Sequence, residues 1–156
     1  MWRAVLATLL AAIAVTSCTN PFSTNDMFPP SRADLQKEID KHPGIPFVLP
    51  FDIPDGYQFI DHTFSTRAVD GRTTSRGLTF SPEPSKNHPV VNFCIELVDS
   101  GAEICNADRN GDTAQVVTRR HLNLVVSIYL SKNDPAAKKV WLEVRLTTEL
   151  DAVTWL

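Results

Sequence analysis

Cysteine is the residue type in this chain whose side chains could do the most varied chemistry, because a thiol can be oxidised, acylated or bound to a metal. The 156 residues hold three of them, Cys18, Cys94 and Cys105, and an odd number cannot be fully paired within one chain. Redox enzymes usually place two residues between their cysteines, at the start of a helix. Ten residues separate Cys94 from Cys105, so this pair lacks the spacing of a redox centre.

The first cysteine follows an apolar N-terminal segment. Arg3 precedes a run of twelve almost uninterrupted apolar residues, 4–15. A membrane-spanning helix needs about 20 such residues, whereas a positive residue before about 7–15 apolar ones is typical of a secretory signal. The run ends in Val15-Thr16-Ser17-Cys18, which resembles the lipobox of bacterial lipoproteins. The resemblance implies cleavage before Cys18, a diacylglycerol group on its thiol and acylation of the new amino group.

This resemblance divides the chain into a signal peptide (1–17), a lipid-attached tether (18–30) and one globular domain (31–156). Two or more acyl chains anchor a protein stably without spanning the bilayer. We therefore expect the protein on the extracytoplasmic face of the cell membrane. The segment 48–57 (VLPFDIPDGY) resembles an entry motif of small extracytoplasmic lipoproteins of Gram-positive, actinobacterial type, and it identifies no activity.

Outside the cytoplasm disulfides persist, so Cys94 and Cys105 are expected to form one. Asp99-Ser100-Gly101 between apolar residues is typical of a three-residue hairpin loop. Folding about that loop would place the two cysteines opposite each other on neighbouring strands, where Cβ atoms lie about 4.5–5.5 Å apart. The sequence therefore predicts a disulfide that staples one hairpin.

Histidines and acidic side chains offer two further kinds of site. The four histidines, at 42, 62, 88 and 121, do not have metal-ligand spacing, but a His/Asp pair of a hydrolase could assemble from distant positions, with His62, His88 and His121 as candidates. Asp108-Arg109-Asn110-Gly111-Asp112 resembles the start of a calcium loop. Thr113 and Arg119 stand where glycine and a closing glutamate belong, so a polar turn is the favoured interpretation.

Arginines and one tryptophan are the candidates for an interaction surface. A polar loop at 65–77 carries three of the arginines, and two more precede the long strand at 121–130. If they converge, they would form a basic patch on an acidic domain; scattered, solvated charges are the alternative. The tryptophan is either exposed on the wet face of a strand or covered and part of the core. The candidates are Arg67, Arg72, Arg76, Arg119, Arg120 and Trp141.

The remaining pattern predicts an α+β fold. Ser31 is expected to cap a helix that Pro43-Gly44 ends, and a proline-spaced strap follows at 43–56. Strands are expected at 57–64, 78–80, 90–98, 102–105, 114–118, 121–130 and 140–146, with a short helix at 149–155. The prediction is one antiparallel sheet of about five to seven strands, with the early helix packed on one face.

Composition limits the function classes. Hydrophobic residues at 43% exclude wholesale disorder, and a net charge of −3 excludes a strongly basic nucleic-acid binder. No nucleotide-binding or nucleophile-elbow motif is present, and we expect no cofactor or resident metal. The sequence thus favours a lipid-anchored, non-enzymatic binding module for an envelope protein or a cell-wall component. An envelope hydrolase and a small-ligand or cation carrier using 106–113 are the alternatives.

Overall fold

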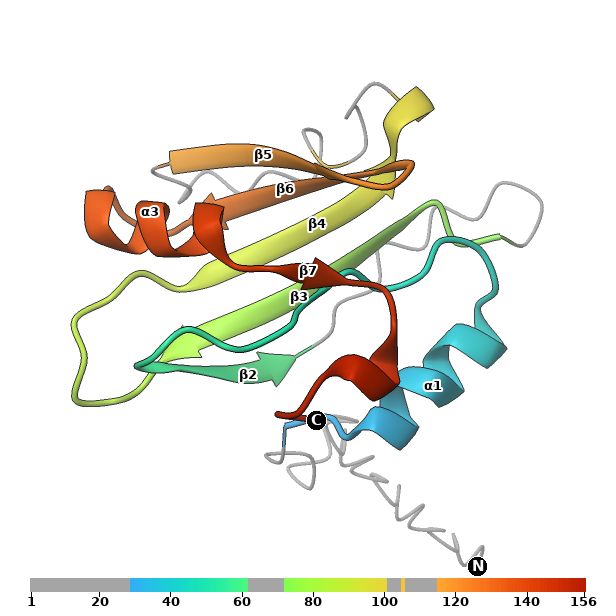
Figure 1. Cartoon of the computed structure of the whole chain (residues 1–156), viewed down its shortest axis with the longest axis horizontal. Helices are drawn as coiled ribbons and strands as arrows, with labels where there is room; N and C mark the ends of the chain where they lie inside the picture. The colour runs from blue at the N-terminus through green and yellow to red at the C-terminus, as the bar shows by residue number, and fades with distance from the viewer. Residues whose placement is uncertain (1–28, 62–71, 101–104, 106–114) are drawn as a thin grey trace, which may run out of the picture.

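The computed structural model describes residues 29–61, 72–100, 105 and 115–156 (Figure 1). Its main feature is a five-stranded antiparallel sheet in the order β2 (Tyr57–Asp61), β3 (Ser75–Pro82), β4 (Val91–Leu97), β6 (Leu124–Leu130) and β5 (Gln115–His121). A two-stranded ribbon pairs β1 (Leu49–Pro50) with β7 (Leu146–Thr147). The helices are α1 (Arg32–Lys41) and α3 (Pro135–Glu143), with 3₁₀ turns η1 (Val98–Ser100) and η2 (Leu150–Ala152). This arrangement confirms the expected α+β class.

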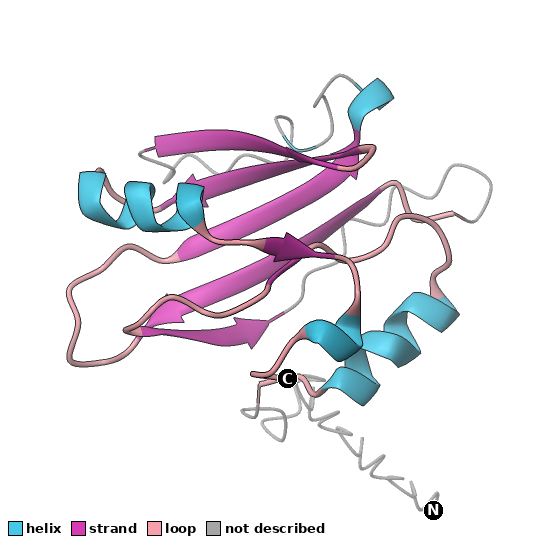
Figure 2. Ribbon diagram, in the orientation of Figure 1, coloured by secondary structure: helices cyan, strands magenta, loops and turns pink. Residues whose placement is uncertain are grey.

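One face of the main sheet carries the hydrophobic core. On the central strand β4, Phe93 lies opposite Leu78 of β3 and Ile128 of β6, and all three side chains are buried. Successive side chains of a strand point to opposite faces, so the alternating apolar residues of these strands share one surface. Figure 2 shows α3 and the β7 segment crossing the same face of the sheet. α3 and β7 therefore help to cover the core, to which the segment 45–49 also contributes buried apolar residues.

The structure confirms the helix that the sequence predicts at the start of the domain. Ser31 caps α1 in a capping box, with its hydroxyl accepting from the backbone N–H of Asp34 while the Asp34 carboxylate accepts from the backbone N–H of Ser31. Leu35 packs from this helix into the core. Gly56 adopts a φ of 81° in the turn before β2, a conformation that glycine accepts without a steric penalty.

The prediction of a strand at 140–146 is wrong, because most of this segment belongs to helix α3. Asp134 caps the helix through its carboxylate, which accepts from the N–H groups of Ala136 and Ala137, and Pro135 occupies the first turn. Ala137 and Trp141 then share the buried side, four residues apart. The alternation of apolar residues along this segment was therefore coincidental, and the Asp134 cap with Pro135 is the local helix signal that the expectation missed.

The C-terminal half of the structure differs from the sequence-based prediction in two smaller ways. β5 and β6 form a hairpin that joins the two strands expected separately, and Leu122 at its turn has a positive φ of 55° and is 76% exposed. The expected helix at 149–155 is reduced to the single turn η2. Figure 1 shows this turn beside α1.

Candidate functional site

The expected basic patch does not form on the described surface, because Arg76 is fully buried. Its guanidinium donates from Nε to the carbonyl of Ile45 (2.6 Å) and from Nη2 to the carbonyl of His42, the residue that ends α1. It also lies over the Phe47 ring, 4.7 Å from the centroid. Burial lowers the pKa of Arg76, and the bonded carbonyls compensate part of the cost of burying its charge.

Arg119 performs the same task for α3. Its Nη1 donates to the carbonyl of Val144, the residue that ends the helix, at 2.5 Å. A guanidinium near helix C-terminal carbonyls is favourable because those carbonyls carry the negative end of the helix dipole. Arg72 and Arg120 are exposed, and Arg67 lies outside the described residues. Two of the five arginines are thus helix-end caps, which spacing in the sequence does not reveal.

Trp141 is a core residue and does not contribute to an interaction surface. It is 0% exposed and packs edge-on against Tyr57 and Phe93, with ring centroids 5.1 and 5.4 Å away. Burial of the Tyr57 hydroxyl raises its pKa above the usual value, so this side chain is neutral at neutral pH. The core interpretation of Trp141 is confirmed.

The three histidines that the structure describes lie in different segments of the fold. His42 ends α1, His121 ends β5, and His62 lies outside the described residues. His88 stacks on Tyr57, and its Nδ1 lies 3.7 Å from Oδ2 of Asp134, whose other oxygen caps α3. The hydrogen bonds from α3 hold the pKa of Asp134 below its usual value. The Asp134 carboxylate of this pair therefore caps the start of α3. Among the described residues, no group of three metal-ligating side chains occurs.

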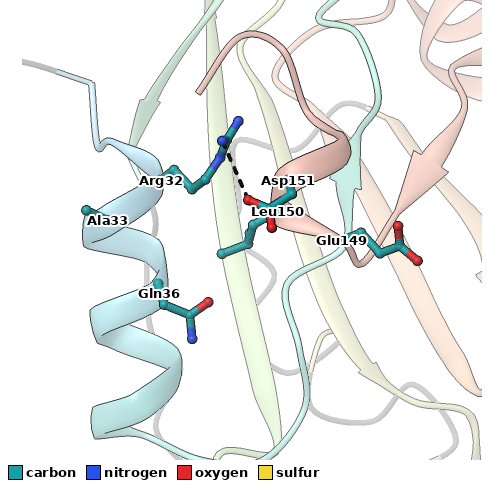
Figure 3. A pocket seen from close by; sticks show the side chains of 6 residues that line it. All are labelled: Arg32, Ala33, Gln36, Glu149, Leu150 and Asp151. Carbon is teal, nitrogen blue, oxygen red and sulfur yellow. Dashed lines mark ion pairs between the residues drawn. The ribbon is translucent and has the colours of Figure 1, made fainter.

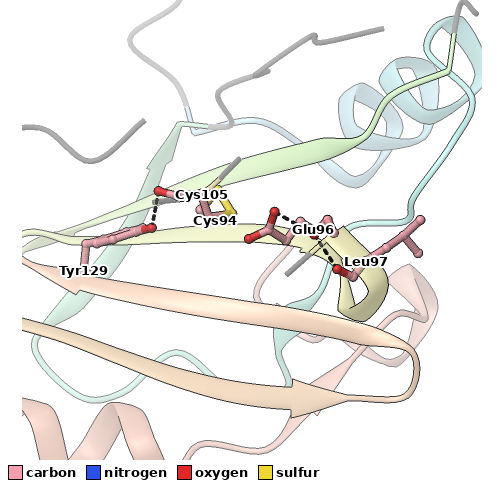
Figure 4. The surroundings of a disulfide bond; sticks show 6 residues. Cys94, Glu96, Leu97, Cys105 and Tyr129 are labelled. Atoms are coloured by element: carbon pink, nitrogen blue, oxygen red, sulfur yellow. Dashed lines mark hydrogen bonds between the residues drawn. A yellow bond between two sulfur atoms is a disulfide. The ribbon is translucent and has the colours of Figure 1, made fainter. Parts of the chain in front are cut away.

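The disulfide between Cys94 and Cys105 is confirmed, with Cα atoms 5.6 Å apart, but the expected hairpin is not (Figure 4). Both edges of β4 pair with other strands, β3 and β6, and Cys105 has helical backbone conformation. Cys105 instead lies against the second face of the sheet, where Tyr129 of β6 donates its hydroxyl to the Cys105 carbonyl. The calcium-loop candidate at 108–112 lies outside the described residues.

Removal of this disulfide should reduce stability measurably. A double variant, Cys94→Ser with Cys105→Ser, is expected to lower the free energy of unfolding by about 2–3 kcal/mol, because the bridge closes a short loop. Urea unfolding measures this change. In a Cys18→Ser chain, a thiol count on folded, non-reduced protein should find no reactive thiol, and two reactive thiols would contradict the bridge.

A concave surface runs along the side of β2 that no other described strand pairs with. It is a groove of about 770 Å³, and we call it the β2 groove. Four consecutive strand residues, 57–60, form one wall, and the segments before α1 and after η2 form the others. Its lining residues are Pro29, Pro30, Ser31, Ile53, Tyr57, Gln58, Phe59, Ile60, Trp155 and Leu156.

The walls of the β2 groove are held by contacts distant in sequence. The indole Nε1 of Trp155 donates to the carbonyl of Pro50 at 2.9 Å, and its ring packs against Phe59, with centroids 5.3 Å apart. Ile60 stands at the rim and is 43% exposed. Sequence reasoning missed this site, although it predicted the strand that begins at residue 57.

A second hollow, of about 680 Å³, lies between α1 and η2 (Figure 3). Arg32 reaches across it, with Nη1 3.6 Å from the Asp151 carboxylate and Nη2 donating to the carbonyl of Val153 at 2.7 Å. Gln36 and Glu149 also line it. Arg32 thus joins α1 to the C-terminal segment across this hollow, so we describe it as a polar seam.

Within the described part of the chain, no helix has the length and apolar character needed to cross a membrane. The β2 groove, the helix-capping Arg76 and Arg119, and the disulfide are the features that distinguish this domain. Comparison of the chain with protein-family models, curated protein sequences and solved structures found no match.

Proposed function

We propose that this protein is a lipid-anchored, non-enzymatic interaction module on the extracytoplasmic face of the cell membrane, and that it binds a partner through the β2 groove. The lipobox-like segment ending at Cys18 supports the anchor. The Cys94–Cys105 disulfide is consistent with a compartment outside the cytoplasm. The observation that carries the binding function is the β2 groove itself.

Binding sites for other molecules are usually concave and mostly apolar, with a few polar groups that fix orientation. The β2 groove fits this description, because aliphatic, aromatic and proline side chains form most of it and Gln58 and Ser31 add polar groups. Ile60 remains 43% exposed at its rim, so it offers apolar area that a partner could bury.

The position of the groove suits a partner at the membrane. Pro29 and Pro30 line it, and eleven residues, 18–28, separate it from the proposed lipid. A fully extended chain spans at most about 3.3–3.6 Å per residue, which places the groove within roughly 40 Å of the bilayer. A membrane-associated envelope protein is therefore the favoured partner class.

Substitution Ile60→Glu should reduce partner binding more than about tenfold, because a carboxylate would lose its hydration when the partner covers the rim. A photo-crosslinking side chain at Gln58, in lipidated protein on intact membranes, measures capture of the partner. Leu122→Glu is the matched control, since Leu122 is more exposed (76%) and lies at the turn between β5 and β6.

Equal loss of crosslinks in Ile60→Glu and Leu122→Glu would contradict the proposal. Unchanged crosslinking in Ile60→Glu would contradict it as well. Thermal unfolding of both variants checks that each remains folded.

A further inference from the structure

We propose that the β2 groove takes an extended, uncharged segment of a partner protein, which adds to the sheet as a further strand beside β2. This inference rests on the proposed function and specifies its partner. Strand addition is a general mode of peptide recognition in which backbone hydrogen bonds provide affinity and side-chain pockets provide specificity.

The first argument is the state of the strand edge. β2 is a terminal strand of the main sheet, with β3 on its inner side. The N–H of Glu83 donates to the carbonyl of Gly56, and the register then pairs Gln58 with Ser81. Hydrogen-bonded pairs alternate along an antiparallel ladder, so the N–H and C=O of Phe59 point away from β3. Phe59 lines the groove, which means that these backbone groups face the proposed segment.

The second argument is shape. The groove is lined by four consecutive residues of β2, 57–60, so it follows the strand. The register of β2 against β3 shifts between Phe59 and Asp61, which limits the regular edge to the same few residues. An extended segment would lie along this edge, with alternate side chains directed toward Trp155 and Ile53 on the opposite wall.

The third argument is charge complementarity. Among the residues that the structure describes, no side chain lining the β2 groove is charged, although charged residues make up 21% of the chain. The opposite terminal strand, β5, carries Arg119, Arg120 and His121. A charged segment would lose hydration in the β2 groove without gaining a partner, so an uncharged segment fits it better.

The test uses the full lipidated chain in lipid nanodiscs and two synthetic probes. One is an eight-residue peptide of alternating valine and threonine, capped at both ends. The other has the same side chains but carries N-methyl groups at alternate residues, which removes the N–H donors of one edge. Hydrogen exchange of the Phe59 amide, followed by NMR, is the measurement, and the amides of β5 are the internal control.

When the concentration of the first peptide is ten times its dissociation constant, hydrogen exchange of the Phe59 amide should slow about tenfold. Exchange of the β5 amides should not change. The N-methylated peptide should give no protection, and Ile60→Glu should abolish the effect that Leu122→Glu retains. This combination supports strand addition.

Three results would overturn the inference. Equal binding of both peptides would mean that the groove recognises side chains only, and the proposed docking function would stand. Absence of protection by the first peptide, with crosslinking still sensitive to Ile60→Glu, would also leave docking intact. A Phe59 amide that is already protected without peptide would indicate that residues 19–28 of the chain occupy the edge.

Discussion

Substitution Trp141→Ala should lower the free energy of unfolding by about 3–5 kcal/mol, the range typical of a large aromatic side chain removed from a core. Trp141 is 0% exposed and contacts Phe80 and Phe93 of the sheet, with ring centroids 4.9 and 5.4 Å away. It is the side chain through which α3 attaches to the main sheet. Urea unfolding followed by far-ultraviolet circular dichroism measures the change.

Val140→Ala is the matched control for Trp141, because it shortens the adjacent residue of the same helix at a position that is 44% exposed. This control should change stability by less than about 0.5 kcal/mol. A decrease in the free energy of unfolding of less than about 1 kcal/mol for Trp141→Ala would contradict the core role of Trp141. Trp141 would then again be a candidate for a surface contact.

Substitution Arg76→Ala should lower the free energy of unfolding by about 2–3 kcal/mol, because it removes a fully buried side chain and the donor to a buried carbonyl. It would leave the carbonyl of Ile45 without its donor, and an unsatisfied buried acceptor costs about 1–3 kcal/mol. The carbonyl of His42 would lose the guanidinium but keep the hydroxyl of Thr73 as a donor. The substitution would also uncover the Phe47 ring. Urea unfolding again provides the measurement.

Two further variants serve as controls for the stability change of Arg76→Ala. Arg72→Ala removes the same side chain from an exposed position nearby in sequence and should change stability by less than about 0.5 kcal/mol. Arg76→Lys keeps the charge but replaces the planar fork with a single ammonium, so it should recover only part of the loss. Equal stability of Arg76→Ala and Arg72→Ala would show that Arg76 does not cap α1.

The parts of the fold that the sequence predicts correctly are those set by local chemistry. The capping box at Ser31 and Asp34 defines the start of α1, and Gly56 defines the turn before β2. Cys94 and Cys105 pair as expected, and this prediction rested on the count of cysteines and on the expected compartment. Each of these inferences needs only a few neighbouring residues or a count.

The parts that sequence reasoning missed depend on contacts between distant segments. Arg76 and Arg119 look like solvated loop charges until the ends of α1 and α3 are placed beside them. The 140–146 segment has an alternating pattern, and the cap at Asp134 outweighs it. The β2 groove has walls from three separate regions, so no single stretch of sequence encodes it.

The contacts that tie the early elements to the late ones also constrain when the domain can fold. Arg32 of α1 donates to the carbonyl of Val153, 121 residues away, and Trp155 donates to the carbonyl of Pro50, 105 residues away. β1 likewise finds its partner only in β7. Contacts of such long range are slow to form, and they require that the late segment has been synthesised. A chain exported from the N-terminus would therefore remain without its closing contacts during translocation, and would complete its core only after the last strand had crossed.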